Sequence, residues 1–294
     1  MLWTVFTLIA AASQTVRNAM QRELTASLGT VGATHVRFLF GFPFALLFLA
    51  IVLAATGQGL PHTPAMFWPW VVWGALAQIF ATALMLSAMG ERSFVVAYAY
   101  IKTEPVQVAI FGLVFLGDKL SMPIGIAVLI ATAGVIVMSL KPGTAANSSV
   151  RSTVVGIAAG SMFALSAVGY RGAILLLANP HFVLAATFTV TVGLVLQAGL
   201  LSLYLAVRDP SVLRAIAKAW KPSLFAGFMG AFASEFWFLA FAIATAASVR
   251  TLALIEVLFA QGISRFIFKQ PTAPREAIGI VLVVIGVALL VYAS

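Results

Sequence analysis

The chain has 294 residues, of which 62% are hydrophobic and 9% are charged. A soluble domain averages about 45–50% apolar and about 25% charged residues, and it needs a polar surface however large its core is. The composition therefore excludes an ordinary soluble protein and indicates a polytopic membrane protein. A net charge of +9 also suits nucleic-acid binding, but the basic residues lie mainly in loops between apolar segments. We therefore expect a lipid bilayer, and no nucleic acid, as a partner.

Apolar stretches near the length that crosses a bilayer, about 20 residues, recur along the whole chain. They run near 2–21, 32–55, 66–88, 93–115, 121–140, 153–177, 181–206, 222–243, 248–268 and 276–293. Polar or Gly/Pro-rich residues separate them, except near residues 244–248, where the break carries no charge. The sequence predicts an all-α membrane protein with ten transmembrane helices.

The two halves of the chain share a weak similarity on either side of a hydrophilic linker at residues 141–152. Shifts of 152 or 154 positions pair identical residues, although any single match also fits chance. The pairs are Phe80/Phe232, Ala88/Ala240, Glu104/Glu256, Ile126/Ile278, Gly134/Gly286, Arg17/Arg171 and Ala19/Ala173. Since five helices are an odd number, the second half enters the membrane upside down, as in transporters whose site lies between inverted repeats. We therefore expect two inverted five-helix repeats, 1–145 and 146–294, around a central cavity.

Lys and Arg in short loops predict the orientation of the chain. One side collects most of them: Arg22, Arg92, Lys141, Arg151, Arg208, Arg214, Lys218, Lys221, Lys269 and Arg275. The other side carries both termini and only Lys119. The positive-inside rule therefore predicts that both termini lie outside the cytoplasm, in a bacterial-type inner (plasma) membrane.

Two segments carry a resemblance to a known family: TEPVQVAIFGLVFLGDKLS (103–121) and IEVLFAQGISRFIF (255–268). With the five-plus-five helix pattern, they make the whole chain similar to the EamA-type branch of the drug/metabolite transporter (DMT) superfamily. In that family a helix with a proline near its start leads to a short Leu-Gly-acidic turn, which Leu116-Gly117-Asp118 supplies. The second half departs from this pattern at Val257 and at Lys269-Gln270.

The resemblance implies a transporter of small metabolites, similar to amino-acid exporters such as the aromatic amino-acid exporter. It also implies that both termini lie in the cytoplasm, which disagrees with the charge count. For the orientation of this chain we favour the charge count.

Several ionisable residues lie inside the predicted helices, where each costs roughly 2.5–3.5 kcal/mol and normally faces the bundle interior. The acids and the lysine well inside are Lys102, Glu104, Glu235 and Glu256. The arginines nearer the helix ends are Arg17, Arg37, Arg171, Arg250 and Arg265. For these arginines we expect the side chains to reach out to the lipid headgroups.

Lys102 and Glu104 are two positions apart, so on a helix they point about 200° away from each other and cannot form an i,i+4 pair. Glu104 therefore needs a partner on another helix, a substrate cation or a proton. Pro105 leaves the carbonyl of Ile101 without its helical donor and bends the helix there. The pair fits either a structural salt bridge between helices or the wall of a substrate cavity.

Polar and aromatic residues in the middle of the predicted helices are the candidate binding groups. A carboxylate at Glu235, beside Trp237, suits an ammonium group through charge and cation–π attraction, although these rings also fit a lipid-facing position. Each amide and tyrosine fits helix–helix bonding equally well. The candidate substrate-binding residues are Gln14, Gln78, Tyr98, Tyr100, Lys102, Glu104, Gln107, Tyr170, Glu235, Trp237 and Glu256. We expect no catalytic residue, no metal and no cofactor.

The sequence favours a monomeric secondary transporter that exports small metabolites, amino acids first, by alternating access. It contains no GxxxxGK[ST] motif for ATP, so coupling to a proton through Glu104, Glu235 or Glu256 and facilitated diffusion both stay open. An uptake carrier or exchanger is the nearest alternative. An intramembrane enzyme is less favoured, because there is no HExxH and the three histidines lie in separate segments, and a channel lacks a repeated filter sequence.

Overall fold

The computed structural model describes residues 1–89, 99–139, 150–179, 181–259, 261 and 273–294, and these ranges contain helices and no strand. Eight stretches within them are long and apolar enough to cross a membrane. The expected all-α, multi-pass membrane protein is therefore confirmed. The first of these stretches, Leu2–Thr56, has 55 residues, which is more than twice the length that one crossing needs.

This first stretch consists of α1 (Leu2–Leu39) and α2 (Phe42–Thr56) and folds back on itself at Gly29. Gly29 has φ 69° and ψ 173°, a backbone conformation that only glycine adopts readily. The Nε2 of Gln21 donates a hydrogen bond of 3.0 Å to the carbonyl of Ala33, twelve residues later. The predicted segments 2–21 and 32–55 therefore correspond to the two arms of one helical hairpin, whose helices continue almost to the turn.

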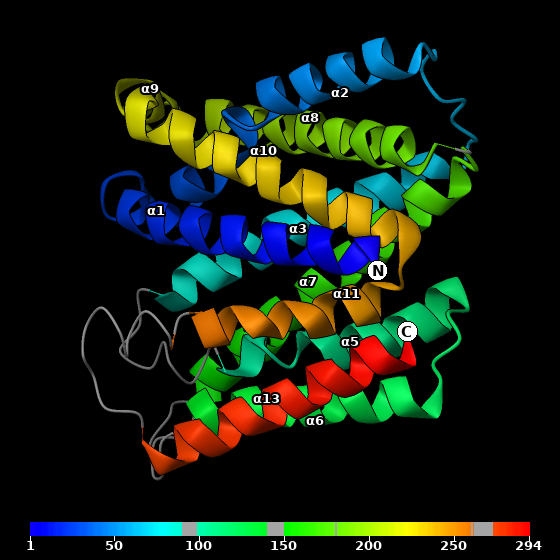
Figure 1. Ribbon diagram of the computed structural model, residues 1–294. Helices are drawn as coiled ribbons and strands as arrows, with labels where there is room; N and C mark the ends of the chain where they lie inside the picture. The colour runs from blue at the N-terminus through cyan, green and yellow to red at the C-terminus, as the bar shows by residue number, and fades with distance from the viewer. Residues whose placement is uncertain (90–98, 140–149, 180, 260, 262–272) are drawn as a thin grey trace.

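The remaining helices follow in chain order. They are α3 (Phe67–Met89), α5 (Glu104–Phe111), a π-helical turn η1 (Gly112–Leu116), α6 (Met122–Ser139), α7 (Val150–Leu176), α8 (Phe182–Arg208), α9 (Pro210–Lys218), α10 (Trp220–Ile243), α11 (Ala246–Leu252), a 3-10 turn η2 (Ala253–Ile255) and α13 (Pro274–Ala293). Most of them run along one common direction (Figure 1). The closest pairings join α1 to α10, α3 to α7 and α6 to α13.

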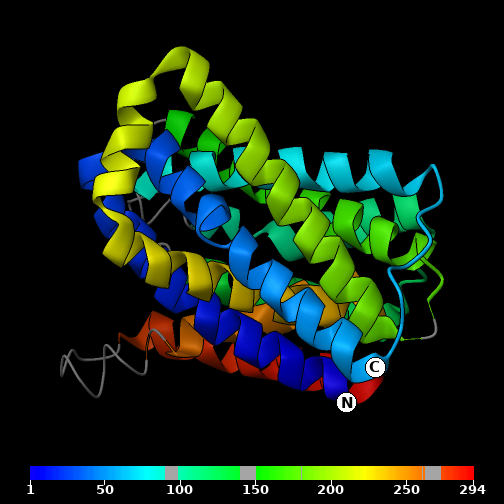
Figure 2. The ribbon, with the colours of Figure 1, turned by 90° about the horizontal axis from the view of Figure 1, so that it is seen from above.

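The helices form a bundle with α6 and α13 side by side at one edge and α2 and α8 at the opposite edge (Figures 1 and 2). The N and C termini lie at the same end of this bundle (Figures 1 and 2). Met1 and Ser294 line one surface hollow there. The short helix α9 lies at the other end (Figure 1).

The expected helix breaks near residues 57–59, 117–119 and 208–210 are present, and so are two breaks next to the ionisable residues inside the bundle. Lys102 and Thr103 form a turn, and α5 begins directly after them with Pro105 in its first turn, as the missing N–H of a proline predicts. The uncharged break near residues 244–248 separates α10 from α11. There Thr245 caps α11, because its Oγ1 accepts a 3.2 Å hydrogen bond from the N–H of Ser248.

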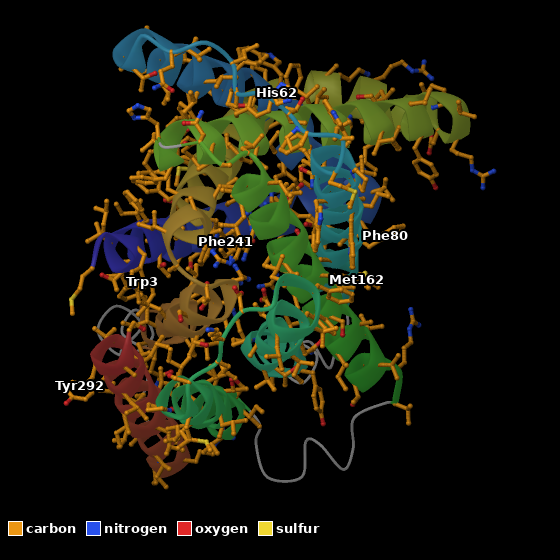
Figure 3. All side chains as sticks on the ribbon, turned by 90° about the vertical axis from the view of Figure 1, so that its right-hand side faces the viewer. Trp3, His62, Phe80, Met162, Phe241 and Tyr292 are labelled. Carbon is orange, nitrogen blue, oxygen red and sulfur yellow. The ribbon has the colours of Figure 1, made fainter. Side chains whose placement is uncertain are left out.

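Polarity is arranged inside out, as a bilayer requires. Large apolar side chains such as Phe80 and Tyr292 are exposed on the periphery, whereas Phe241 lies in the interior (Figure 3). Arg17 and Arg37 are buried in the bundle, with exposed fractions of only 1% and 2%.

The expectation that the arginines reach the headgroups is therefore wrong for Arg17 and Arg37, and also for Arg171 and Arg250. Arg250 pairs with Glu104 inside the bundle. Arg171 has partners inside the protein: its Nη1 donates to the carbonyls of Phe241 and Ala244, both at 2.6 Å, and its Nη2 lies 3.3 Å from Asp118. Asp118 belongs to the Leu116-Gly117-Asp118 turn, where Gly117 has φ 66°. Arg265 lies outside the described residues.

Candidate substrate site

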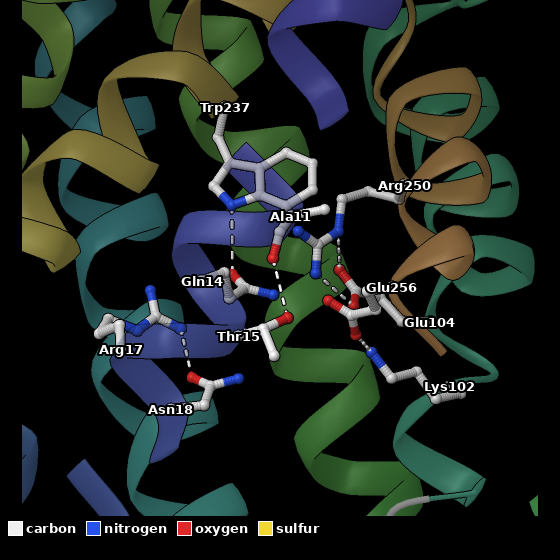
Figure 4. A network of polar contacts seen from close by, with 10 residues as sticks. All are labelled: Ala11, Gln14, Thr15, Arg17, Asn18, Lys102, Glu104, Trp237, Arg250 and Glu256. Carbon is white, nitrogen blue, oxygen red and sulfur yellow. Dashed lines mark hydrogen bonds and ion pairs between the residues drawn. The ribbon is translucent and has the colours of Figure 1, made fainter. Parts of the chain in front are cut away.

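Two buried ion pairs join the broken helix around Lys102 to the helix around Arg250 (Figure 4). The Nε of Arg250 lies 2.6 Å from one carboxylate oxygen of Glu104, and its Nη2 donates to the other oxygen, also at 2.6 Å. The Nζ of Lys102 pairs with Glu256. Glu104 therefore has the partner on another helix that its spacing from Lys102 requires.

A chain of contacts continues from this pair to α10 and α1. The guanidinium of Arg250 lies over the ring of Trp237, 4.6 Å from the ring centroid, a cation–π geometry. The indole Nε1 of Trp237 donates to Oε1 of Gln14 at 3.2 Å. Figure 4 shows Trp237 between Gln14 and Arg250, so the three side chains fix one another.

A small cavity of about 30 Å³ lies beside this chain of contacts. This volume is well below that of sites that enclose a small molecule, about 300–1,000 Å³, so the cavity has to widen before it can admit a substrate. Its polar lining is Gln14, Arg37, Gln78, Ser166, Tyr170, Ser234 and Arg250. Its apolar lining is Phe163, Ala167, Trp237, Phe238 and Phe241. The residues come from α1, α3, α7, α10 and α11, so the cavity lies where segments far apart in the sequence meet.

Gln78 is held in place on the α3 side of the cavity. Its Oε1 accepts a hydrogen bond of 2.9 Å from Nε2 of Gln197 and lies 3.5 Å from the hydroxyl of Tyr170. Gln197 itself also donates to the carbonyl of Ala75 at 3.1 Å. These bonds use only the side-chain oxygen of Gln78. Its amide nitrogen takes no part in them.

Arg37 enters the cavity with only weak neutral partners. Its Nη1 lies 3.3 Å from Oγ1 of Thr82 and its Nη2 lies 3.4 Å from Oγ of Ser234. Its buried Nε has no hydrogen-bond partner. Arg17 donates from Nη2 to Oδ1 of Asn18 at 2.7 Å, while its Nε and Nη1 are buried without one. Within the described ranges, neither arginine has an ion pair with an acid.

The sequence-predicted site residues fall into three groups. Gln14, Gln78, Tyr170 and Trp237 line the cavity. Lys102, Glu104 and Glu256 form the ion pairs behind Arg250. A third group lies elsewhere.

In the third group, Tyr100 lies before the helix break and Gln107 after it. Gln107 accepts a 2.5 Å bond from Oγ of Ser161 and donates to Oγ1 of Thr103 at 3.0 Å, so it joins helices. Glu235 faces α8, where Oγ1 of Thr187 donates to it at 2.5 Å. Tyr98 lies outside the described residues.

Sequence reasoning missed Arg37 and Arg250 as cavity residues, together with Ser166 and Ser234. It treated the arginines as helix-end groups because they lie within a few residues of the predicted boundaries. A signal was present in the charge count: the predicted helices hold more basic than acidic side chains. Basic groups in excess of acids inside a bilayer point to a bound anion or a water-filled site.

Known proteins resemble the chain in sequence over residues 1–140 and in fold over nearly its whole length. Residues 1–140 match the EamA-like transporter family. No curated protein matches the chain. Twenty-eight chains of solved structures match. One of them, described only as "Crystal structure of protein", has a TM-score of 0.64 at 17% identity and covers 99% of both chains; this shows a shared fold and no more. The chain is thus similar over residues 1–140 to EamA-like transporters, which supports the DMT superfamily.

Proposed function

We propose that the protein is a secondary transporter that exports small metabolites, amino acids among the candidates, across an inner (plasma) membrane by alternating access. The observation that carries the proposal is the cavity of polar and cationic side chains buried among apolar, membrane-length helices. Ionisable groups are costly in a bilayer and mark transport pathways. The match of residues 1–140 to a transporter family supports the same class over an enzyme.

The ten-helix, inverted-repeat plan with halves 1–145 and 146–294 is part of this proposal. The helix pairings support it: exchanging the halves turns the α1–α10 pairing into α7–α3 and leaves α6–α13 unchanged. The helix breaks support it as well. The turn at Lys102-Thr103 directly precedes Glu104, and the 3-10 turn η2 directly precedes Glu256, its counterpart at a shift of 152.

Alternating access requires the two halves to rearrange around the site. Both ion pairs, Lys102–Glu256 and Glu104–Arg250, join the first half to the second, so we propose that they hold the state described here. If transport is coupled to a proton, Glu235 is the acid best placed to carry it. It is buried and has no cation partner in the described part of the chain, and its Oε2 makes no hydrogen bond.

The proposed orientation places both termini outside the cytoplasm. Arg208, Arg214, Lys218 and Lys221 are exposed around α9, at the end of the bundle opposite the termini (Figure 1). By the positive-inside rule this basic end faces the cytoplasm. We propose that the carrier acts as a monomer.

A transport screen tests the proposed function. The purified chain in liposomes is offered labelled amino acids and small organic acids, with protein-free liposomes as the control. We expect saturable, protein-dependent uptake of at least one of these classes. Hydrolysis or modification of a solute without net movement indicates an enzyme and contradicts the proposal.

A further inference from the structure

We propose that the central cavity selects substrates that carry a carboxylate and no ammonium group, attached to an aromatic or apolar body. In this arrangement Arg37 receives the carboxylate and Arg17 adds positive charge beside it. The inference rests on the proposed transport function and narrows its substrate class from metabolites in general to small organic anions.

The charge balance of the interior favours an anionic substrate. Around the cavity the structure describes four basic side chains, Arg17, Arg37, Lys102 and Arg250; Glu256 pairs with Lys102, and Glu104 pairs with Arg250. The buried acid Glu235 accepts a hydrogen bond from Thr187 on α8 and has no ion pair with an arginine among the described residues. A buried ion without a counter-charge costs several kcal/mol. Arg17 and Arg37 therefore leave the cavity with positive charge that an anionic substrate neutralises.

The geometry of Arg37 favours a carboxylate as its partner. Arg37 lines the cavity, and among the described residues its guanidinium has two hydroxyls at hydrogen-bond distance and an Nε without a partner. A guanidinium binds a carboxylate through two parallel N–H···O bonds, and such charge-assisted bonds are shorter and stronger than bonds to a hydroxyl. The hydroxyls of Thr82 and Ser234 are thus weak partners that a carboxylate replaces.

Gly230 brings the two arginines together on the same wall. A Cβ at this position would lie 3.1 Å from Cγ of Arg37 and 3.5 Å from Cδ of Arg17. The aliphatic stems of both side chains therefore pack over one residue of α10, and their charges act on the same part of the site.

The lining of the cavity disfavours the ammonium group of an amino acid. No acidic side chain lines the cavity among the residues that the structure describes. Both oxygens of Glu104 are held by Arg250, and Glu235 faces Thr187 on α8. Arg250 is already neutralised by Glu104, so an ammonium group would meet the positive charge of Arg37 without an acid of its own, and like charges in a low-dielectric site repel strongly.

The remaining lining defines the other end of the substrate. Phe163, Trp237, Phe238 and Phe241 form an aromatic wall, which suits a ring or a short aliphatic chain once the cavity has widened. The site thus offers a cation for one end of the molecule and an apolar surface for the other.

Three probes with the same ring test the proposal on the unmodified chain: 3-phenylpropionate, phenylalanine and phenethylamine. Their binding to the purified protein in detergent is measured by calorimetry. We expect 3-phenylpropionate to bind about tenfold more tightly than phenylalanine, which corresponds to about 1.4 kcal/mol, and phenethylamine not to bind. Arg37→Gln should reduce the affinity for 3-phenylpropionate about tenfold, while Arg208→Gln, at an exposed arginine, should leave it unchanged.

Equal or tighter binding of phenylalanine or phenethylamine overturns the inference, and so does the absence of binding by all three probes. An Arg37→Gln variant that is folded by circular dichroism and binds 3-phenylpropionate normally also overturns it. The three-probe comparison keeps the test decisive if that variant does not fold. Binding of 3-phenylpropionate without its movement across proteoliposomes contradicts the transport function instead and leaves the anion site in place.

Discussion

At the scale of single residues, the ion pair of Glu104 with Arg250 positions a cation at the cavity. Glu104 holds two of the three guanidinium nitrogens, Nε and Nη2, at 2.6 Å, while a face of the guanidinium lies over Trp237. Arg250 is therefore fixed between an acid and an aromatic ring. We therefore propose that Glu104 acts on a substrate through Arg250 rather than by direct contact.

Replacing Glu104 by Gln should lower transport more than it lowers the amount of folded protein. The amide keeps the shape and one acceptor but loses the charge, and a hydrogen bond to a charged group is worth about 1.5–3 kcal/mol. We expect transport to fall about tenfold or more. Asp209→Asn, at an exposed acid on the loop before α9, is the matched control and should transport normally. Normal transport by Glu104→Gln would show that the pair is dispensable.

Lys102 and Glu256 should tolerate exchange better than loss. Removing one member of a buried pair costs about 3–5 kcal/mol, so Lys102→Met should lower the melting temperature in detergent markedly. The double variant Lys102→Glu with Glu256→Lys keeps the pair and should recover much of the loss. A double variant that is no more stable than the single one would indicate that other contacts set the geometry of this site.

The sequence could predict part of this site and not the rest. The 200° separation of Lys102 and Glu104 and the absence of a helical donor at Pro105 predict partners on another helix and a broken backbone. The identity of the partner, Arg250, depends on how α11 packs against α5, which no local pattern encodes. Arg37 could not be recognised as a cavity residue because it lies near the start of a predicted helix. Distance along the chain does not report depth in the bundle.

At the scale of elements, α6 and α13 pack through glycine. A Cβ at Gly279 would lie 2.6 Å from the carbonyl oxygen of Gly134 and 2.7 Å from Cβ of Met138. Backbones this close are typical of small residues at membrane helix interfaces.

Gly279→Val should therefore separate α6 from α13. Forcing a larger side chain into a tight contact costs about 1–3 kcal/mol, which should appear as a lower resistance to unfolding in detergent. Ala277→Val, two residues away on the exposed face of α13, adds comparable bulk without this contact and should have little effect. Equal stability of the two variants would contradict the close packing.

Most helix positions could be predicted from the hydrophobic pattern, but their ends could not. The first predicted segment stops near residue 21 because Gln21, Arg22 and Glu23 are polar. The helix instead continues to the turn at Gly29, because Gln21 finds a buried acceptor at Ala33. A tertiary hydrogen bond thus outweighs the local polarity.

At the scale of the whole molecule, the orientation in the membrane can be measured, since the chain has no native cysteine. Ser294→Cys, at the end of the bundle where both termini lie, should react with a membrane-impermeant thiol reagent in intact cells. Ala217→Cys, exposed on α9, should react only after the cells are opened. The reverse pattern would place both termini in the cytoplasm and show that the basic end of the bundle faces outward.

We propose that the buried cavity of the whole molecule belongs to a carrier rather than to a channel or an enzyme. Counterflow tests this most directly: uptake of a trace of labelled substrate is compared between proteoliposomes loaded with the same unlabelled substrate and empty ones. A carrier that alternates between two sides should show faster and transiently concentrative uptake into the loaded vesicles, and Glu104→Gln should weaken it. Equal uptake into loaded and empty vesicles, with measurable flux in both, would contradict alternating access.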